Sequence, residues 1–476
     1  MKTYPLIFAT VFVSIVSIYF SSSQLLYLPL PWSDEAIYHQ MVQTHHQTGA
    51  FGIPMWKDLL LETETHNYWY PPFFFSALSL YARFVDLTIV SQRQLSMFLA
   101  TIAAVFFLFL SREYIKSKYY FLPILIMLTD FIWLRGSRMS RPESLILTLG
   151  AISLVLLHLF VMHKKKYWLG LAVVTASLSL LSHYYGLWVS IAGFLFLWFY
   201  SKANYKKQAV IFGILTLIPL FLWWLQLYPH WNVLYDHTFL GVENKVSIEP
   251  ITFLANKTNT LPLKIQYSLL QAAGLISIII VWSKKKARWI AASLGIIWLM
   301  ILVGRMFWYV VYIIPFTYLL WAIAYEHIHQ KHIKLIWKFV GLVIVVLNLT
   351  IWYTSVSNET SSNYAYTKLV KSVAETIPAD ATVFLTAEPE TYYGFVEYNP
   401  SVNLLMYPAV STSKEAYKKV LDRADYVIFT GDYVSRLFGN FLPNYLEKNT
   451  AEYRIVGQDY GQAVTIIKLT PSEMRQ

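Results

Sequence analysis

The chain of 476 residues contains no cysteine, and only 14% of its residues are charged. The absence of cysteine excludes disulfide bonds, thiolate zinc sites and a thiol nucleophile. Acidic residues are the scarcer charge, since 27 Asp and Glu stand against 38 Lys and Arg. The net charge of +11 does not indicate nucleic-acid binding, because the basic residues form short clusters between apolar blocks rather than one aromatic-rich face.

Long apolar blocks dominate the chain, in which hydrophobic residues make up 56%. Many of them have the length, roughly 17 to 25 residues, that crosses a bilayer as a helix. Blocks such as 145–161 are apolar on every side, whereas a helix of a soluble core has a polar face. The sequence therefore predicts an α-helical polytopic membrane protein. We expect the first block, 4–20, to be a retained span, because no small-residue cleavage pattern follows it.

Five basic clusters set the predicted orientation, because Lys and Arg in short loops mark the cytoplasmic side of a membrane. With all five inside, the amino terminus is cytoplasmic, the carboxyl terminus lies outside, and about eleven spans result. The apolar stretch 71–90 then has to stay at the outer surface as a juxtamembrane or re-entrant helix. Two prolines open it, and Arg83 and Asp86 interrupt it. The basic clusters are 112–118, 164–166, 202–207, 284–288 and 331–338.

The composition changes after about residue 353, where polar residues become frequent. Short β-rich runs then alternate with helical stretches, a pattern typical of a small α/β domain. We predict a membrane domain over 1–353, with a first outside loop at 31–92, and a soluble extracytoplasmic domain over 354–476. The predicted strands are 382–385, 426–429 and 464–469, and the predicted helices are 366–376 and 414–424.

Three arginines occupy the short outside loop 135–143, where the positive-inside rule disfavours them. The forked guanidinium group suits phosphate oxygens, so Arg138 and Arg141 are candidate ligands of a lipid phosphate. The alternative is that these arginines pair with lipid headgroups or with the nearby acids Asp130 and Glu143.

Two acids follow the first span directly. Ser33 is a suitable N-cap, which places Asp34 and Glu35 in the first turn of a helix whose apolar face, with Tyr38, is expected to lie on the membrane. The alternative is that these acids only complement the helix dipole. Together with Glu143, however, they suit glycosyl transfer: one carboxylate deprotonates the acceptor hydroxyl, and arginine stabilises the charge on the departing phosphate.

Two further outside turns contain candidate ligands. His183, in the tight turn 182–186, can contact phosphate or acceptor, or it can cap the carbonyls of a helix end or meet lipid headgroups. Arg305 precedes a tyrosine-rich span and is either a phosphate ligand or a snorkelling arginine in an aromatic belt. The sequence has no Gly-rich phosphate loop, zinc-binding His pair or nucleophile elbow. We expect no metal requirement, although acidic pairs can hold Mg²⁺ or Mn²⁺.

These residues resemble the motifs of the GT-C membrane glycosyltransferases, in the branch that contains protein O-mannosyltransferases and the bacterial lipid A aminoarabinose transferase. The resemblance covers residues 1 to about 325. The matching segments are Asp34-Glu35-Ala36-x-Tyr38, Tyr70-Pro71-Pro72-Phe73, Arg93 at the start of the second span, Ser137-Arg138-Met139-Ser140-Arg141-Pro142-Glu143, and Arg305 ahead of Tyr309 and Pro315.

The resemblance implies an inverting transferase that takes its sugar from undecaprenyl or dolichyl phosphate and uses no nucleotide donor. The acceptor would be lipid A, a cell-surface polysaccharide or a protein. It also implies that Asp34 is the catalytic base or its close support and that Glu143 is the second-loop acid. Glu35 would belong to the same acidic pair, and Tyr38, Tyr70 and Arg93 would line the site. A bacterial inner-membrane enzyme facing the periplasm is favoured.

Departures from the family pattern bear on the substrate. Tyr70 stands where the aminoarabinose transferases have lysine, and His183-Tyr184-Tyr185-Gly186 stands where relatives often have Lys-Gly. Glu143 replaces an aspartate of many relatives. These differences argue against assuming aminoarabinose as the sugar. Three other functions stay open: a flippase for lipid-linked sugars, a non-catalytic assembly protein, and a ligase that transfers a whole oligosaccharide.

Overall fold

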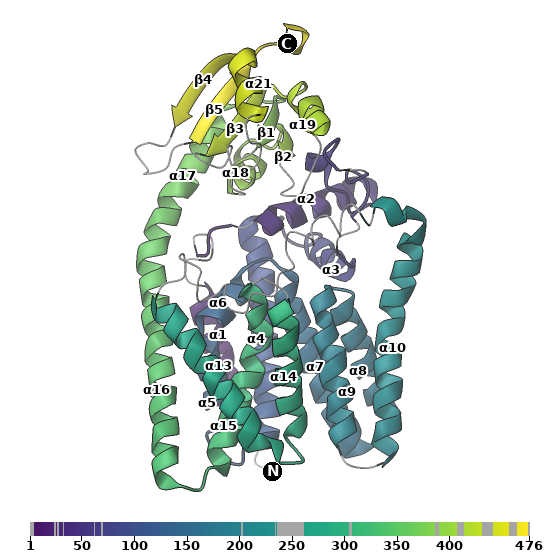
Figure 1. Ribbon diagram of the computed structural model, residues 1–476, viewed down its shortest axis with the longest axis vertical. Coiled ribbons are helices and arrows are strands. Elements are labelled where there is room, and N and C mark those ends of the chain that lie inside the picture. The colour runs from purple at the N-terminus through teal and green to yellow at the C-terminus, as the bar shows by residue number, and fades with distance from the viewer. Residues whose placement is uncertain are drawn as a thin grey trace.

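The computed structural model describes most of the chain. The described residues are 4–22, 25, 28–31, 33–60, 62–67, 70–200, 203–233, 235, 261–303, 307–385, 390–406, 414–430, 441–456 and 464–474. Within them, a helical bundle forms one end of the molecule and a five-stranded sheet with its helices forms the other (Figure 1).

Six helices in the described part of the chain are long and apolar enough to cross a membrane: 5–22, 89–114, 142–163, 205–233, 261–282 and a helix within 331–376. Shorter apolar helices lie between them. Large apolar side chains point outward from the bundle, among them Phe8, Phe339 and Leu342, which are 72%, 63% and 61% exposed. An exterior of this kind is stable only in lipid. The chain is therefore a multi-pass membrane protein, as the sequence predicts, while the number of about eleven spans stays a prediction.

The helices of the bundle follow one another with short connections. Their bounds are α1 Tyr4–Ser22, α4 Ile89–Tyr114, α5 Leu122–Leu128, α6 Phe131–Arg138, α7 Pro142–His163, α8 Lys166–Leu180, α9 Leu187–Phe199, α10 Ala203–Leu227, α13 Leu261–Trp282, α14 Arg288–Val303, α15 Ile314–His327 and α16 Lys331–Thr354. Short 3₁₀ turns lie at Pro54–Trp56, Tyr184–Gly186, Tyr228–His230, Phe307–Tyr312 and Ser472–Met474.

The first loop contains two helices, α2 Ser33–Thr48 and α3 Phe73–Tyr81. Thr88 ends the segment after α3 and caps α4: its hydroxyl accepts from the Ser91 amide at 3.1 Å, and the Ser91 hydroxyl accepts from the Thr88 amide at 2.8 Å. This capping box starts a new helix and separates α3 from the second span. The stretch 71–90 thus forms a short helix and a connection, as expected of a segment that does not cross.

Asp130 divides the next helical stretch into α5 and α6. One carboxylate oxygen accepts from the backbone amides of Ile132 and Trp133 at 2.8 and 3.3 Å, which caps α6. The other oxygen accepts from Tyr318 and Gln266, both at 2.8 Å. Asp130 is thus engaged by α13 and α15 rather than paired with the arginines after it, which was one of the alternatives for Arg138 and Arg141.

The helical path continues from α16 through a π-helical turn at Ser355–Glu359 into α17, Thr360–Thr376. No break falls at the predicted boundary between residues 353 and 354, so the division of the chain there stays a prediction. Figure 1 shows α16 and α17 as one long rod that links the bundle to the sheet.

The carboxyl-terminal domain is built on a mixed sheet in the order β2-β1-β3-β5-β4. Strands β1, β2 and β3 are parallel, and β5 pairs antiparallel with β3 and β4. The three predicted strands are present, together with β2 and β4, which the sequence analysis did not find. The elements are β1 Thr382–Leu385, α18 Glu390–Tyr398, β2 Asn403–Met406, α19 Lys414–Leu421, β3 Tyr426–Thr430, α21 Phe441–Asn449, β4 Thr450–Val456 and β5 Val464–Leu469.

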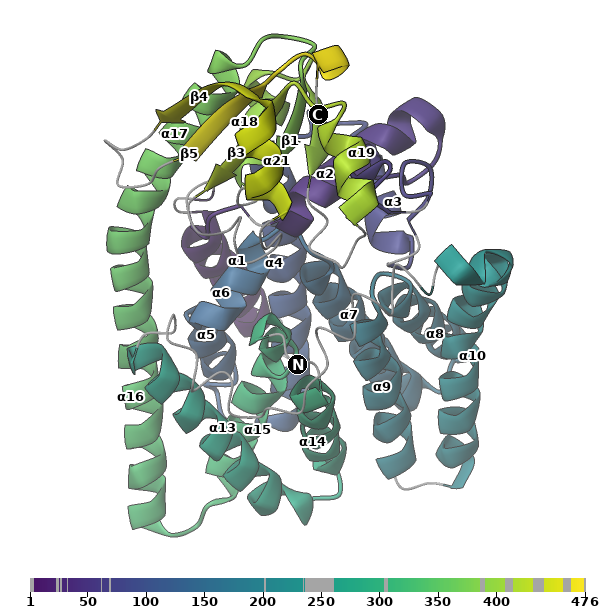
Figure 2. The same cartoon turned by 45° about the horizontal axis from the view of Figure 1, so that its top comes forward.

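The first loop lies between the bundle and this domain (Figure 2). Apolar side chains of α2, among them Tyr38 and Met41, share one buried cluster with α3, α17 and the sheet. The expectation that this face of α2 rests on the membrane is therefore wrong, because the protein itself covers it. Asp58 adds two ion pairs, at 2.6 Å to Lys419 and 2.7 Å to Arg423. The domain is thus docked on the loop that contains Asp34.

We expect Asp58→Asn to loosen this docking only slightly, by about 0.2–1 kcal/mol, because both cationic partners are substantially exposed. Asn tolerates the left-handed backbone of Asp58, whose φ is 64°, so the effect reports the charge alone. Hydrogen exchange of α19 measures it, with Asp380→Asn, at another left-handed Asp, as the control. Unchanged exchange in Asp58→Asn would show that the two ion pairs contribute nothing to docking.

Candidate active site

Arg141 joins the two acids that the sequence analysis singled out from distant parts of the chain. Its Nη1 donates to Asp34 Oδ2 at 2.7 Å, and its Nε lies 3.1 Å from Glu143 Oε1. Pro142 opens α7 directly after it and places Glu143 in the first turn, where the helix dipole favours a carboxylate. The Asp34 side chain is 20% exposed, against 6% for Arg141 and 4% for Glu143. Asp34 is therefore the carboxylate of this cluster that a substrate can reach.

Glu35 points to the other side of α2 and is completely buried. Arg93 Nε and Nη2 donate to its two oxygens at 2.9 and 2.7 Å. The backbone amide of Ser140 donates to Oε1 at 2.8 Å. Arg93 also donates to the carbonyls of Leu25 and Pro29, both at 2.7 Å. This arrangement fastens the first loop to α4 and to the residue before Arg141, and it sets the position of the reachable acid next to it.

His39 extends the same buried network. Its Nδ1 accepts from the Gln92 side-chain amide at 3.0 Å, and Gln92 Oε1 accepts from the Ser140 hydroxyl at 3.2 Å. The imidazole is 3% exposed. Burial lowers the pKa of His39 to about 4, so the ring is neutral at pH 7.

This burial predicts a pH-dependent stability. The unfolded chain binds a proton at His39 below about pH 6.5, whereas the folded chain does so only below about 4. The contribution of neutral His39 to stability is therefore complete above about pH 6.5 and is lost as the pH is lowered to about 4, by about 3 kcal/mol in total. Unfolding of the detergent-solubilised protein at pH 7 and 4.5 measures this. His39→Gln is expected to remove most of the fall and the exposed control His329→Gln none of it; equal pH dependence in all three proteins would contradict the assignment.

Aromatic rings from three connections gather beside the carboxylates. The Tyr70 ring lies 6.0 Å from that of Tyr38 and 5.3 Å from that of His183. The His183 ring lies 5.7 Å from that of Tyr309, which stacks on Tyr185 at 3.8 Å. His183 Nδ1 also accepts from the Tyr185 amide at 3.1 Å, so the ring caps the turn between α8 and α9. His183 thus caps a backbone amide at the start of this turn rather than the carbonyls of a helix end, and its ring contacts the aromatic rings of the candidate site.

Burial and the neighbouring charges together determine the protonation states of the site residues. Burial lowers the pKa of Arg141, but Glu143 and Asp34 together raise it well above its ordinary value, so the guanidinium stays charged. Burial, together with Tyr70 and Asp34, raises the pKa of Tyr38 well above its ordinary value. Burial and Asp34 likewise raise the pKa of Tyr70. Two neutral phenols thus surround one reachable carboxylate and one permanent cation.

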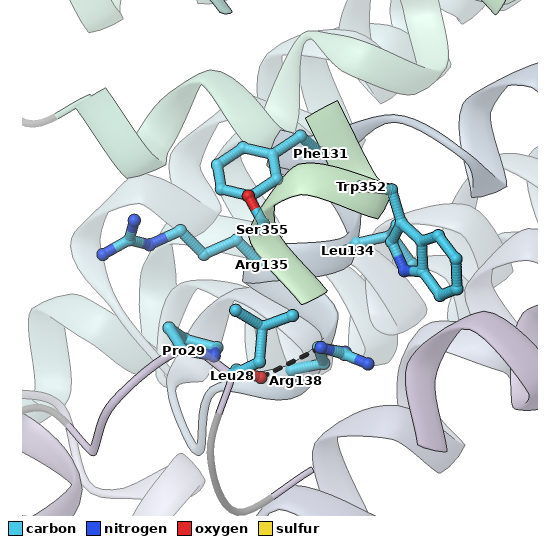
Figure 3. A pocket seen from close by; sticks show the side chains of 8 residues that line it. All are labelled: Leu28, Pro29, Phe131, Leu134, Arg135, Arg138, Trp352 and Ser355. Carbon is cyan, nitrogen blue, oxygen red and sulfur yellow. Dashed lines mark hydrogen bonds between the residues drawn. The ribbon is translucent and has the colours of Figure 1, made fainter. Parts of the chain in front are cut away.

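Arg138, another predicted phosphate ligand, lies at the end of the helix that precedes this cluster. Helix α6 extends through Arg138, so the arginine loop is shorter than the sequence indicates. Arg138 is 2% exposed and donates to the carbonyls of Leu28 and Phe20 at 3.0 and 2.9 Å. It lines a small cavity of about 20 Å³ beside Trp352 (Figure 3). Arg305 lies outside the described residues.

Several residues of the site escaped the sequence analysis. A hydrogen-bonded chain joins α2 to the segment between α6 and α7 through His39, Gln92 and Ser140. Tyr185 supplies a ring that stacks on Tyr309. One sequence signal pointed to the tyrosines of the site, because tyrosines recur at the predicted outside turns. Gln92 had none and Ser140 had only its place in the quoted arginine segment, because the tertiary structure alone brings these two residues together. No group of three or more His, Cys, Asp or Glu within the described ranges is arranged to hold a metal ion.

Comparisons with known proteins identify the fold. No protein-family model and no curated protein matches the chain. The structure of ArnT from Cupriavidus metallidurans bound to undecaprenyl phosphate is similar, with a TM-score of 0.60 over 98% of each chain at 11% identity. Its apo state gives a TM-score of 0.62 over 96% of this chain and 97% of that one, also at 11% identity.

A second kind of enzyme shares the architecture. The archaeal oligosaccharyltransferase AglB from Archaeoglobus fulgidus, in complex with an inhibitory peptide and a dolichol-phosphate, gives a TM-score of 0.58 at 10% identity. The match covers 95% of this chain and 73% of AglB. The chain therefore has the GT-C fold, as its resemblance to that family implies.

Proposed function

We propose that the chain is a glycosyltransferase that moves a sugar from a polyprenyl phosphate to an extracytoplasmic acceptor. The observation that carries the proposal is Arg141, shared between Asp34 and Glu143 at the end of the bundle next to the carboxyl-terminal domain. Two solved proteins of this fold are described with undecaprenyl phosphate and dolichol-phosphate, which supports a lipid-linked donor.

Asp34 takes the part of the general base. The acceptor hydroxyl gives its proton to the Asp34 carboxylate while its oxygen forms a bond to the anomeric carbon. The bond between that carbon and the donor phosphate breaks, and the polyprenyl phosphate leaves with the electron pair. Attack from the opposite side inverts the anomeric carbon.

Arg141 stabilises the charge that gathers on the leaving phosphate, and Glu143 holds its guanidinium in place. Glu35 and Arg93, which are buried against each other, position these groups rather than touch a substrate. Tyr38, Tyr70 and His183 line the sugar and phosphate region. Arg138 holds the segment after α1 by its carbonyl contacts. Arg305 remains a candidate phosphate ligand from its place in the sequence.

The basic clusters support the proposed orientation, in which the amino terminus is cytoplasmic and the site and carboxyl-terminal domain lie outside. An inner-membrane location and a lipid, glycan or protein acceptor belong to the same proposal.

Reconstituted proteoliposomes test the function directly. Radiolabelled sugars on undecaprenyl and dolichyl phosphate are supplied with lipid, glycan or protein acceptors, and labelled product is separated from donor. We expect labelled product to form in proteoliposomes that contain the protein and not in liposomes that lack it. Movement of the labelled lipid across the bilayer without product would favour a flippase instead, and transfer only from an oligosaccharide donor would favour a ligase.

A further inference from the structure

A groove of about 380 Å³ opens on the side of the bundle between α5, α15 and α16. It lies at the end away from the carboxyl-terminal domain, where α15 passes into α16 (Figure 1), so it is separate from the candidate active site. The volume falls in the range of about 300–1,000 Å³ that is usual for ligand sites. Its lining is mostly apolar, with Leu122, Ile126, Trp321, Leu342 and Val345.

The floor of the groove is formed where α15 and α16 pack closely against each other. Gly341 of α16 lies against the Trp321 ring, where a Cβ would approach the ring carbon Cη2 to 2.3 Å. The glycine therefore lets the two helices close the groove from below. The indole N–H of Trp337 donates to the Trp321 carbonyl at 3.1 Å and holds this contact. The mouth faces outward, since Leu342 and Tyr119 at its rim are 61% and 52% exposed.

Positive charge surrounds the polar end of the groove. The Nζ atoms of Lys334 and Lys338 lie 5.5 and 5.9 Å from the centre of the Tyr325 ring, which lines the wall. Ser117 lines the same end. The acid there, Glu326, accepts from the backbone amides of Lys116 and Ser117 at 3.1 and 2.8 Å. Its carboxylate is thus engaged by backbone amides, while the exposed Lys338 lines the groove.

We infer that this groove binds one phospholipid with an anionic headgroup from the leaflet at that end of the bundle. An acyl chain fills the apolar part, and the phosphate of the headgroup meets Lys334 and Lys338 beside Ser117. A zwitterionic lipid would satisfy the apolar wall equally, but its quaternary ammonium offsets the phosphate charge that attracts the two lysines. Charge complementarity therefore selects the anionic lipid.

Native mass spectrometry of the full chain in detergent, titrated with phosphatidylglycerol or phosphatidylcholine, tests this inference. We expect one tightly retained phosphatidylglycerol and weaker retention of phosphatidylcholine. Lys334→Gln with Lys338→Gln is expected to weaken phosphatidylglycerol binding by roughly 30-fold, since each lysine near an anionic lipid contributes a factor of about five. The matched control, Lys164→Gln with Lys165→Gln, removes two lysines from the connection between α7 and α8, outside the groove, and is expected to leave binding unchanged.

A second variant tests the apolar part of the groove independently of its charged end. Val345→Phe, which places a ring in the apolar part, is expected to lower retention of both lipids while the lysines remain. Equal retention of the two lipids by the wild type, or equal loss in both lysine pairs, would overturn the inference. A parallel titration uses undecaprenyl phosphate, and the inference would also be overturned if Lys334→Gln with Lys338→Gln lost this lipid but retained phosphatidylglycerol. None of these readings depends on sugar transfer.

Discussion

Asp34→Asn is expected to lower sugar transfer by about 10²–10⁴-fold, the usual contribution of a general base. The amide keeps the size of the carboxylate and can still accept a hydrogen bond from Arg141, so the protein should fold. It cannot take the proton of the acceptor hydroxyl. The measurement is the rate of labelled product formation in proteoliposomes at equal amounts of folded protein, together with donor binding, which should persist.

The control for this variant is Asp86→Asn, which makes the same carboxylate-to-amide change at an exposed acid of the same loop. It should transfer at the wild-type rate. Normal transfer by Asp34→Asn would remove Asp34 from the mechanism. Loss of donor binding along with transfer would instead assign Asp34 to holding Arg141 for the phosphate.

Glu35→Gln is expected to cost about 3–5 kcal/mol of stability, because it leaves the buried Arg93 guanidinium without its anionic partner. Arg93→Met should cost a similar amount by stranding the Glu35 carboxylate. The double variant removes both charges, so its cost should be clearly smaller than the sum of the two single effects. Thermal or chemical unfolding in detergent measures the stability of all three proteins. A transfer assay on the folded fraction of each then measures the remaining activity.

A half-exposed pair provides the comparison. Lys371 and Glu375 lie 3.7 Å apart on one turn of α17 with about half of each side chain exposed, so Glu375→Gln should change stability by about 0.5 kcal/mol or less. Additive effects of Glu35→Gln and Arg93→Met would mean that the pair does not act as a unit. A cost in Glu35→Gln no larger than that in Glu375→Gln would contradict the structural role.

The fold was largely predictable from the sequence. Apolar blocks of bilayer length are a local property, and the break at Asp130 or the cap at Thr88 depends on a few neighbouring residues. Strands β2 and β4 were harder to predict because each is short, and β4 is largely exposed, so neither shows a clear apolar pattern. Their pairing with distant strands determines them.

The division of labour between Asp34 and Glu35 could not be predicted. The two residues are adjacent, and both fit the first turn of a helix. Successive side chains on a helix diverge by about 100°, so one faces Arg141 and the other faces Arg93. Which arginine meets which acid depends on where α4 and α7 stand relative to the loop. Arg138 illustrates the same limit, because its backbone partners come from segments more than 100 residues away.

The continuous helix that links the bundle to the sheet fixes the distance between these two parts of the protein. The path from α16 through α17 has 46 residues and therefore measures about 70 Å. The hydrocarbon core of a bilayer takes up about 30 Å of that length. More than half of the rod is left to span the interface and stand beyond the membrane, with the sheet at its tip and the first loop wedged beneath. The distance between the sheet and the bundle is thus set by a continuous helix rather than by a flexible linker.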